Sequence, residues 1–177
     1  QMDLGASKRG VSMGPMAIRY GGLCEGLERM GDPVRDLGDI IPPASGATRK
    51  TMRNYQQVSQ VNRQLFQAVS ACLEEGSFDA VTAFNVLLYV EDRPRVLARI
   101  RALLKPEGMF LSAGDCLGEG ITKVGIKKFW KSHTGSMPYV AFDTKRKLEE
   151  DIAAAGFTVL ERENLYPAPP NLFVAAR

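Results

Sequence analysis

Few side chains in this sequence are suited to catalysis, and several of them lie between residues 129 and 142. His133 is the only histidine, the residue type best suited to act as a general base near neutral pH. Phe129, Trp130, Tyr139 and Phe142 flank it, and aromatic faces can line a pocket or attract a cation. The residues predict a substrate pocket formed by Trp130, His133 and Tyr139. The alternative is a core or lid, with His133 an exposed loop residue.

The sequence offers no set of metal ligands. A two-metal hydrolytic site needs several carboxylates together with histidines, whereas this chain has one histidine and no Asp-x-Asp. The chain has an odd number of cysteines, Cys24, Cys72 and Cys116, which are widely spaced and form no CxxC pair. We therefore expect no metal site, no disulfide framework and a reducing, cytoplasmic location.

Hydrophobic spacing predicts the elements of the first half of the chain. Pro15 suits the first turn of a helix that would run to Gly31, and residues 34–39 form a short strand candidate. Residues 1–14 and 41–50 read as loops, the second being the natural linker. Apolar residues at spacings of three and four predict a long amphipathic helix over residues 51–75.

The second half predicts alternating strands and helices. The apolar run 78–89 is typical of a strand buried in a parallel sheet, and Asp92 and Pro94 start a helix that leads into a strand at 109–113. Asp143 or Thr144 caps a helix ending at Gly156, and strands at 157–163 and 172–175 form a hairpin. We expect one α/β domain over residues 1–177, three-layer and Rossmann-like, with a mostly parallel sheet and a C-terminal antiparallel hairpin.

Composition and charge exclude several classes of protein. Hydrophobic residues make up 45% and charged residues 24% of the chain, which is ordinary for a globular domain. The net charge is only +3, and the basic run 145–147 stands beside acidic residues 149–151, as on a solvated helix face. No apolar run approaches the roughly 20 residues that span a bilayer, and no signal peptide pattern is present. We expect neither nucleic acid nor membrane as a partner.

The first half closely resembles the front of arginases, in the ureohydrolase family. The likeness is carried by Lys8-Arg9-Gly10-Val11-Ser12-Met13-Gly14-Pro15-Met16-Ala17-Ile18-Arg19-Tyr20, preceded by Met2-Asp3-Leu4-Gly5, and it covers residues 1 to about 76. It implies hydrolysis at a manganese pair held by Asp and His residues of later motifs. Those motifs, Gly-Gly-Asp-His and Asp-Ala-His-x-Asp, are absent. We therefore expect no arginase activity.

From about residue 77 to 177 the chain resembles the second half of a class I S-adenosylmethionine-dependent methyltransferase. The matching segments are Phe-Asp-Ala-Val at 78–81, Tyr-Val-Glu-Asp at 89–92, Leu-Leu-Lys-Pro-Glu-Gly-Met-Phe at 103–110, Gly-Phe-Thr-Val at 156–159 and Leu-Phe-Val-Ala at 172–175. The resemblance implies that S-adenosylmethionine, if any cofactor, is bound by Phe84, Asn85, Val86 and Leu87. Asp115 would lie at the mouth of the next strand. Phe84, Val86 and Leu87 are equally suited to a core, which leaves Asn85 as the stronger candidate.

The methyltransferase resemblance lacks two features of that family. These are the glycine-rich loop after the first strand and the acidic residue that ends the second strand. Gly118-Glu119-Gly120 follows a later strand and does not match the loop. Our leading interpretation is a chimera, recombined from two families by design, accident or gene fusion, without efficient catalysis and without assigned catalytic residues.

Two alternatives remain open. The chain could be a divergent S-adenosylmethionine-dependent methyltransferase acting on a small molecule, with the front half replacing the cofactor loop. It could instead be a non-enzymatic assembly module. Because the chain opens on a polar, glycine-bearing stretch, we expect an upstream strand to be missing. The exposed sheet edge could then pair with a second copy and form a homo-oligomer.

Overall fold

A computed structural model of the chain describes residues 13–31, 33–41, 55–134 and 139–177. The chain divides into two compact units, Gln1–Glu75 and Gly76–Arg177, so the boundary adjoins the junction inferred between the two resemblances. The single domain over residues 1–177 stays a prediction. Most of the predicted loops 1–14 and 41–50 lies outside the described residues.

Two short helices begin the described part of the first unit. They are α1 (Gly14–Tyr20) and α2 (Leu23–Arg29). The prediction of one helix from Pro15 to Gly31 is wrong, because Gly22 has a φ of 77° and interrupts the right-handed path.

Residues 33–41 form no strand, so the predicted strand at 34–39 is also wrong. The Arg19 guanidinium of α1 instead forms hydrogen bonds with two side chains of this segment. Nη2 donates to Asp36 Oδ1 and Nη1 donates to Asp39 Oδ1, each at 2.9 Å. The hydrogen bond from Arg19, followed by one from the Gly38 N–H, lowers the pKa of Asp36 to about 2.

The long helix of the first unit is confirmed as α3 (Tyr55–Glu75). Its apolar residues recur every three or four positions, and Val61 among them is buried. The first residues of the predicted helix, 51–54, lie outside the described part of the chain. Gly76 follows the helix with a φ of 143°, as expected of a residue that ends it.

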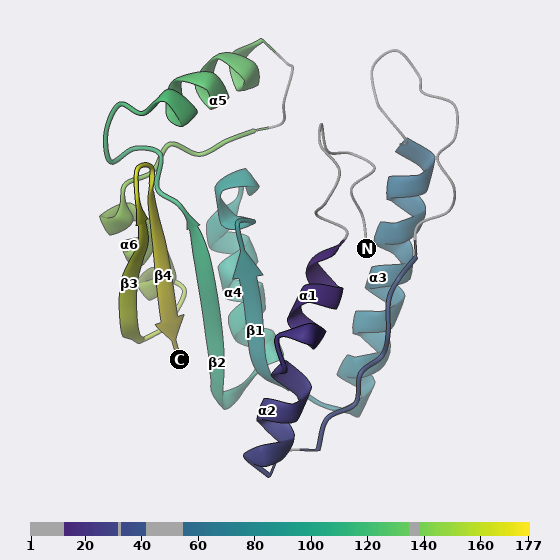
Figure 1. Cartoon of the computed structure of the whole chain (residues 1–177). Coiled ribbons are helices and arrows are strands. Elements are labelled where there is room, and N and C mark those ends of the chain that lie inside the picture. The colour runs from purple at the N-terminus through teal and green to yellow at the C-terminus, as the bar shows by residue number, and fades with distance from the viewer. Residues whose placement is uncertain (1–12, 32, 42–54, 135–138) are drawn as a thin grey trace. The chain divides into compact units, whose positions relative to one another are not determined.

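The second unit is built on a four-stranded mixed sheet (Figure 1). The strands are β1 (Phe78–Phe84), β2 (Leu104–Asp115), β3 (Val159–Pro167) and β4 (Pro170–Ala176), in the order β1-β2-β4-β3. β1 and β2 are parallel, whereas β4 is antiparallel to both of its neighbours. Three strands therefore share one direction. The predicted Rossmann-like α/β class and the C-terminal hairpin are confirmed.

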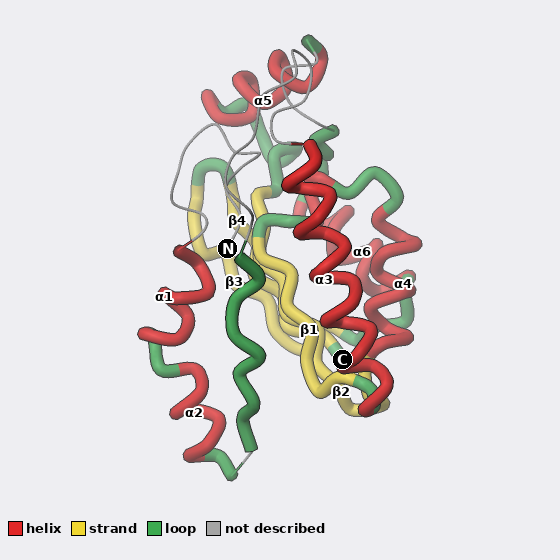
Figure 2. Tube along the Cα trace, turned by 90° about the vertical axis from the view of Figure 1, so that its right-hand side faces the viewer, coloured by secondary structure: helices red, strands yellow, loops and turns green. Residues whose placement is uncertain are grey.

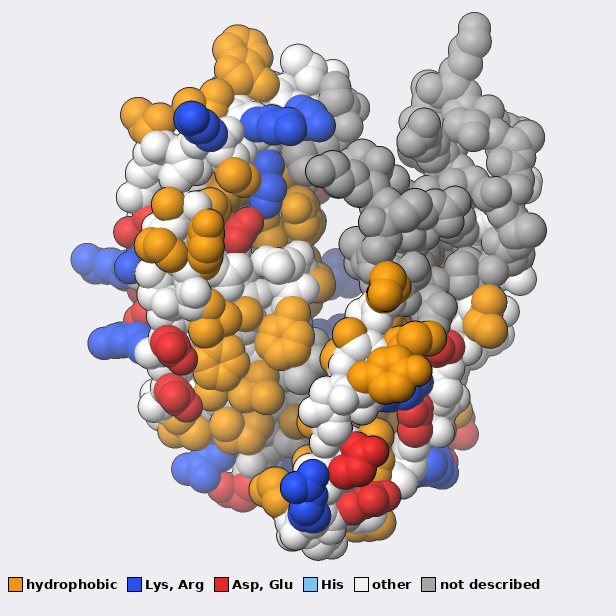
Figure 3. Space-filling model, in the orientation of Figure 1, with side chains coloured by type: hydrophobic (Ala, Val, Ile, Leu, Met, Phe, Trp, Pro, Cys, Tyr) orange, Lys and Arg blue, Asp and Glu red, His pale blue; other side chains and the backbone are white. Residues whose placement is uncertain are grey.

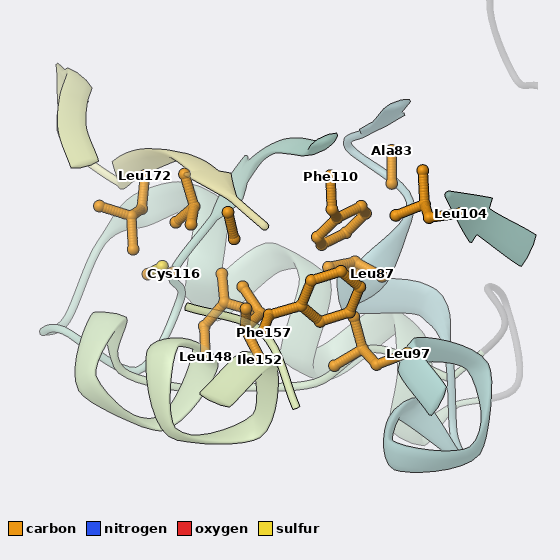
Figure 4. Packing of buried hydrophobic residues seen from close by; sticks show 12 residues of the cluster. Ala83, Leu87, Leu97, Leu104, Phe110, Cys116, Leu148, Ile152, Phe157 and Leu172 are labelled. Carbon is orange, nitrogen blue, oxygen red and sulfur yellow. The ribbon is translucent and has the colours of Figure 1, made fainter. Parts of the chain in front are cut away.

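Helices α4 (Arg93–Leu103) and α6 (Lys145–Ala154) cover one face of this sheet (Figure 2). Both begin as predicted, with the side chain of Asp92 accepting from Arg95 N and that of Thr144 from Lys147 N. Figure 4 shows the buried side chains between sheet and helices. In this core the rings of Phe110 and Phe157 lie 5.3 Å apart. Because Phe157 follows α6 and Phe110 belongs to β2, their contact packs the helical layer against β2.

Two elements near the carboxyl ends of β1 and β2 differ from the predictions. The apolar run 78–89 is a strand only as far as Phe84, after which Asn85 has a φ of 53° and Leu87–Tyr89 form the 3-10 helix η2. A positive φ redirects the chain, so the strand cannot continue. Helix α5 (Lys123–His133) was not predicted. It lies beyond the end of β2 in Figure 1.

Candidate functional site

A cluster of polar side chains lies where β1 and β2 end. In open α/β sheets, ligands bind in the crevice outside the carboxyl ends of the parallel strands. Asn85 directly follows β1, and its N–H donates to Ala113 O of β2 at 2.7 Å. Asp115 ends β2, and Asn171 of β4 is its partner in the antiparallel register. Three neighbouring strands thus bring Asn85, Asp115 and Asn171 together.

The Asp115 carboxylate is held at both oxygens. Asn171 Nδ2 donates to Oδ1 at 3.0 Å, and Lys128 Nζ lies 3.1 Å from Oδ2. The same Asn171 amide reaches Asn85 Oδ1 at 3.5 Å. The Lys128 ammonium also lies 5.6 Å from the centre of the Tyr89 ring, within cation–π range. We call Asn85, Tyr89, Asp115, Lys128 and Asn171 the Asp115 cluster.

The four residues predicted to contact a cofactor divide into two groups. Phe84 and Val86 are half exposed, and Asn85 is exposed within the Asp115 cluster. The side chain of Leu87 instead packs into the hydrophobic core. Since side chains alternate along β1 and Ala83 faces the core, Phe84 lies on the sheet face opposite α4 and α6. Hydrophobic side chains gather on that face in Figure 3.

Helix α5 forms one wall of an apolar groove of about 250 Å³. Thr122 caps the helix by accepting from Gly125 N at 3.0 Å. Phe129 meets Phe142 edge-on, with ring centres 5.7 Å apart. No charged side chain belongs to the described lining, which consists of Leu117, Gly120, Ile121, Thr122, Gly125, Ile126, Phe129, Trp130 and Phe142. The groove therefore suits an uncharged, apolar group.

The structure places the three predicted pocket residues differently. Trp130 lines the groove and is largely exposed. His133 is a residue of α5, not of a loop as predicted, and its Nδ1 lies 2.9 Å from Phe129 O with its ring stacked on Phe129. His133 and Tyr139 are absent from the described lining. The groove thus brings together Phe129, Trp130 and Phe142 of the predicted aromatic cluster.

A buried ion network adjoins Asp115. Arg93, at the start of α4, forms ion pairs with Asp143 and Asp151. The adjoining segment pairs with η2, because Ala141 N donates to Leu88 O at 2.8 Å. Arg93, Asp115 and Asp143 also border a small cavity of about 20 Å³. These contacts connect the segment that carries Phe142 to η2 and to α4.

Sequence reasoning missed three members of the Asp115 cluster. Asn171 was read only as part of the final hairpin, although the start of β4 must return beside the end of β2. Lys128 was missed because α5 was not predicted. Tyr89 was taken as the last residue of a strand, whereas η2 turns it towards Lys128. Recognising the Thr122 cap would have revealed α5.

The described part of the chain contains neither a metal-binding group of side chains nor a membrane-spanning helix. Residues 13–31, 33–41, 55–134 and 139–177 contain no group of three or more His, Cys, Asp or Glu that could hold a metal ion. Among these same residues, no helix is both long and apolar enough to cross a membrane.

Comparison with known proteins yields both resemblances predicted from the sequence. A family model described as a methyltransferase domain matches residues 36–110, so it begins within the segment read as arginase-like. The arginase of Bacillus caldovelox is 42% identical over 86 residues, covering 45% of this chain and 28% of that protein. The arginase of Bacillus subtilis (strain 168) is 44% identical over 81 residues, covering 45% and 27%. The chain spans little more than a quarter of these relatives.

Similar solved structures include methyltransferases. An S-adenosylmethionine-dependent methyltransferase from Mesorhizobium loti shares 20% identity at a TM-score of 0.46, covering 57% of this chain and 62% of that one. A putative O-methyltransferase from Nostoc punctiforme PCC 73102 shares 21% identity at a TM-score of 0.45, covering 57% and 32%. The mixed sheet and the family-model match together give the chain a methyltransferase-like α/β fold with partial similarity to arginases.

Proposed function

We propose that this chain is a recombined α/β protein that binds a small molecule at the Asp115 cluster, without efficient catalysis. The observation that carries the proposal is the Asp115 cluster itself, in which Asn85 directly after β1 and residues of β2, β4 and α5 converge where the parallel strands β1 and β2 end. Asn85 adds a backbone conformation with a positive φ of 53°, which is uncommon for residues other than glycine although asparagine adopts it more readily than most. Such conformations concentrate at binding and catalytic sites.

The residues of the Asp115 cluster suit S-adenosylmethionine in part. That cofactor, when bound, supplies a methyl group on a positively charged sulfur. Asp115 and the Tyr89 ring are groups that stabilise a positive charge, and Asn85 offers a polar side chain beside them. Phe84 and Val86 are accessible, whereas Leu87 would contribute only its backbone because its side chain lies in the core.

Weak or absent turnover is the second element of the proposal. Methyl transfer is a displacement whose rate depends mainly on the positioning of its reactants. The sequence lacks the glycine-rich loop and the ribose-binding acid that position the cofactor in the family it resembles. His133, the residue best suited to act as a base, contacts the Phe129 carbonyl on α5 and does not line the groove.

Calorimetric titration with S-adenosylmethionine and its demethylated product, alongside a thermal melt, tests the binding proposal. We expect micromolar binding and a raised melting temperature, both lost in Asp115→Asn. Asp79→Asn is the matched control, because Asp79 pairs with Lys105 on the exposed side of β1. Titrations without any heat of binding would overturn the cofactor part. Catalytic transfer of a labelled methyl group to any acceptor would instead favour the divergent methyltransferase.

An assembly function has one observation in its favour. Within the described sheet of the second unit, β1 pairs only with β2, so its other edge is available to a strand of a second copy. Sedimentation velocity over a range of concentrations should then show a homo-oligomer that Thr82→Lys dissociates. Ala98→Lys on the exposed side of α4 is the control. A monomer at every concentration would exclude this function.

A cytoplasmic location also belongs to the proposal. Cys24, Cys72 and Cys116 are all free thiols, and unpaired cysteines are typical of a reducing compartment. Cell fractionation of the expressed chain would test the location. Recovery of the chain in a secreted or oxidised form would contradict it.

A further inference from the structure

We propose that the ammonium group of Lys128 occupies a binding position for an organic cation, and that a ligand's ammonium or sulfonium group replaces it between Asp115 and Tyr89. The inference rests on the ligand binding proposed above for the Asp115 cluster and names the chemical class that the cluster recognises. It also assigns Lys128 the role of an internal competitor, which lowers the affinity of the cluster for that ligand.

The carboxylate of this position is held in place without Lys128. Asp115 belongs to β2, and its Oδ1 accepts from Asn171 Nδ2 at 3.0 Å. Asn171 lies opposite Asp115 in the antiparallel ladder, so both side chains are set by the backbone register. Removing the lysine would therefore leave the carboxylate oriented, with Oδ2 available to another cation.

The aromatic side of the position is equally independent of the lysine. Tyr89 ends η2, and its N–H donates to Val86 O at 2.9 Å. The ring centre lies 5.6 Å from Lys128 Nζ, within the about 6 Å over which an aromatic face attracts a cation. A carboxylate and an aromatic face around one ammonium group are the two elements of a site for a substituted ammonium.

The lysine itself is the replaceable component. It belongs to α5, whose described contacts with the rest of the unit include the Lys128–Asp115 pair and the Phe129–Phe142 contact. Its side chain has four rotatable bonds and is 18% exposed, while that of Asp115 is 24% exposed. The ion pair is therefore part-buried, with both side chains still partly accessible to water. A ligand cation can displace the ammonium without unfolding α5.

The chemistry of the position favours an organic cation over a metal ion. Divalent cations require several oxygen ligands, whereas Asp115 is the one carboxylate in the Asp115 cluster. The aromatic ring adds attraction for a weakly hydrated cation but contributes no ligand atom. The preferred ligand therefore carries a quaternary ammonium or a sulfonium.

The first experiment uses Lys128→Met, which keeps an unbranched side chain, shorter by the terminal nitrogen, and removes the charge. The probes are choline, its uncharged isostere 3,3-dimethyl-1-butanol and trimethylsulfonium, each titrated while the side-chain amide signals of Asn85 and Asn171 are followed by NMR. We expect this variant to bind choline about tenfold more tightly than the unaltered chain, because the ligand no longer competes with the lysine for a partly desolvated position beside Asp115 and Tyr89. It should not bind the alcohol.

Two further variants complete the design. Lys127→Met, on the exposed side of the same helix, should bind choline no better than the unaltered chain. Adding Asp115→Asn to Lys128→Met should abolish binding. Equal affinity of Lys128→Met and the unaltered chain for choline would overturn the proposal, as would equal binding of choline and the alcohol. The relative affinities for choline and trimethylsulfonium distinguish an ammonium ligand from a sulfonium ligand.

A measurement on the unaltered chain covers the case in which Lys128→Met fails to fold. Saturating choline should release the ammonium group and raise the acetylation rate of Lys128 relative to that of Lys127, as followed by mass spectrometry. An unchanged ratio would contradict the proposal. Choline binding without S-adenosylmethionine binding would leave the cation site standing and remove the cofactor from the proposed function. The reverse result would preserve the proposed function and remove the cation site.

Discussion

The Arg93 guanidinium joins α4 to α6 through a hydrogen bond of 2.9 Å from Nη1 to Asp151 Oδ2. A second bond reaches Asp143, just before α6. The Arg93 side chain is only 7% exposed, and its Nε has no hydrogen-bond partner within the described residues. Burial of a charge is tolerated where partners neutralise it. The two aspartates therefore neutralise and orient the buried Arg93, and Arg93 in turn orients both carboxylates.

Replacing Arg93 by alanine should destabilise the second unit. The change leaves two carboxylates without their shared cation, and breaking a buried ion pair typically costs about 3–5 kcal/mol. Urea unfolding monitored by hydrogen exchange of α6 peptides measures the loss of stability. Arg95→Ala is the control, because Arg95 lies on the exposed side of the same helix. Equal effects of the two changes would mean that the network contributes nothing specific.

Substitution of Gly118 by alanine should displace the segment that carries Phe142, which lines the α5 groove. A Cβ at Gly118 would lie 2.5 Å from Phe142 O and 2.8 Å from Asp143 C, which are backbone atoms that cannot rotate away. Forcing an extra methyl group into a packed site costs about 1–3 kcal/mol. Thermal melts should show a clear decrease for Gly118→Ala and little change for Gly114→Ala, where no atom lies within 4 Å. A reversed order would contradict this packing.

Two substitutions of Asn85 separate backbone strain from side-chain contacts. Its φ of 53° is accessible to glycine without strain but costs an alanine about 1–2 kcal/mol. Asn85→Ala should therefore unfold at lower urea concentration than Asn85→Gly, although both lose the contact with Asn171. Identical midpoints would show that the positive φ is not retained in solution. Both variants should bind the ligand of the Asp115 cluster more weakly than the unaltered chain does.

Cys116 should resist alkylation. Burial raises the pKa of its thiol to about 11, and its side chain is almost fully enclosed. At pH 8, iodoacetamide should modify Cys24 and Cys72 first, with peptide mass spectrometry identifying each site. The neutral thiol stabilises the fold below the unfolded pKa of about 8.5, and that contribution is lost as pH rises towards 11. Rapid modification of Cys116 at pH 8 would contradict its burial.

The contact between α1 and residues 33–41 should weaken in acid. Because Arg19 and the Gly38 N–H lower the pKa of Asp36 to about 2, its contribution is fully present above the unfolded value near 3.9. It is lost as pH falls through about 2. Amide exchange at Gly38, whose N–H donates to Asp36 Oδ1 at 2.8 Å, should therefore accelerate below pH 3. In Asp36→Asn, exchange should vary with pH only as in an unfolded peptide.

Local patterns predicted the elements that depend on neighbours in the sequence. The helix α3, the caps Asp92 and Thr144 and the C-terminal hairpin all follow from spacing, capping residues and prolines. The predictions failed where a single backbone angle decided the path. Gly22 divided one predicted helix into two, and Asn85 ended β1 early. Neither angle can be read from residue type alone, because glycine and asparagine adopt several conformations.

The sequence by itself determined the α/β class, the two family resemblances and the candidacy of Asn85 and Asp115, because these depend on motifs and periodicity along one segment. Only the tertiary structure decided which residues join them. Asn171 follows Asp115 by more than fifty positions and meets it through the antiparallel register, while Lys128 reaches it from α5. Such contacts depend on strand order and helix placement, which are settled when the whole core packs.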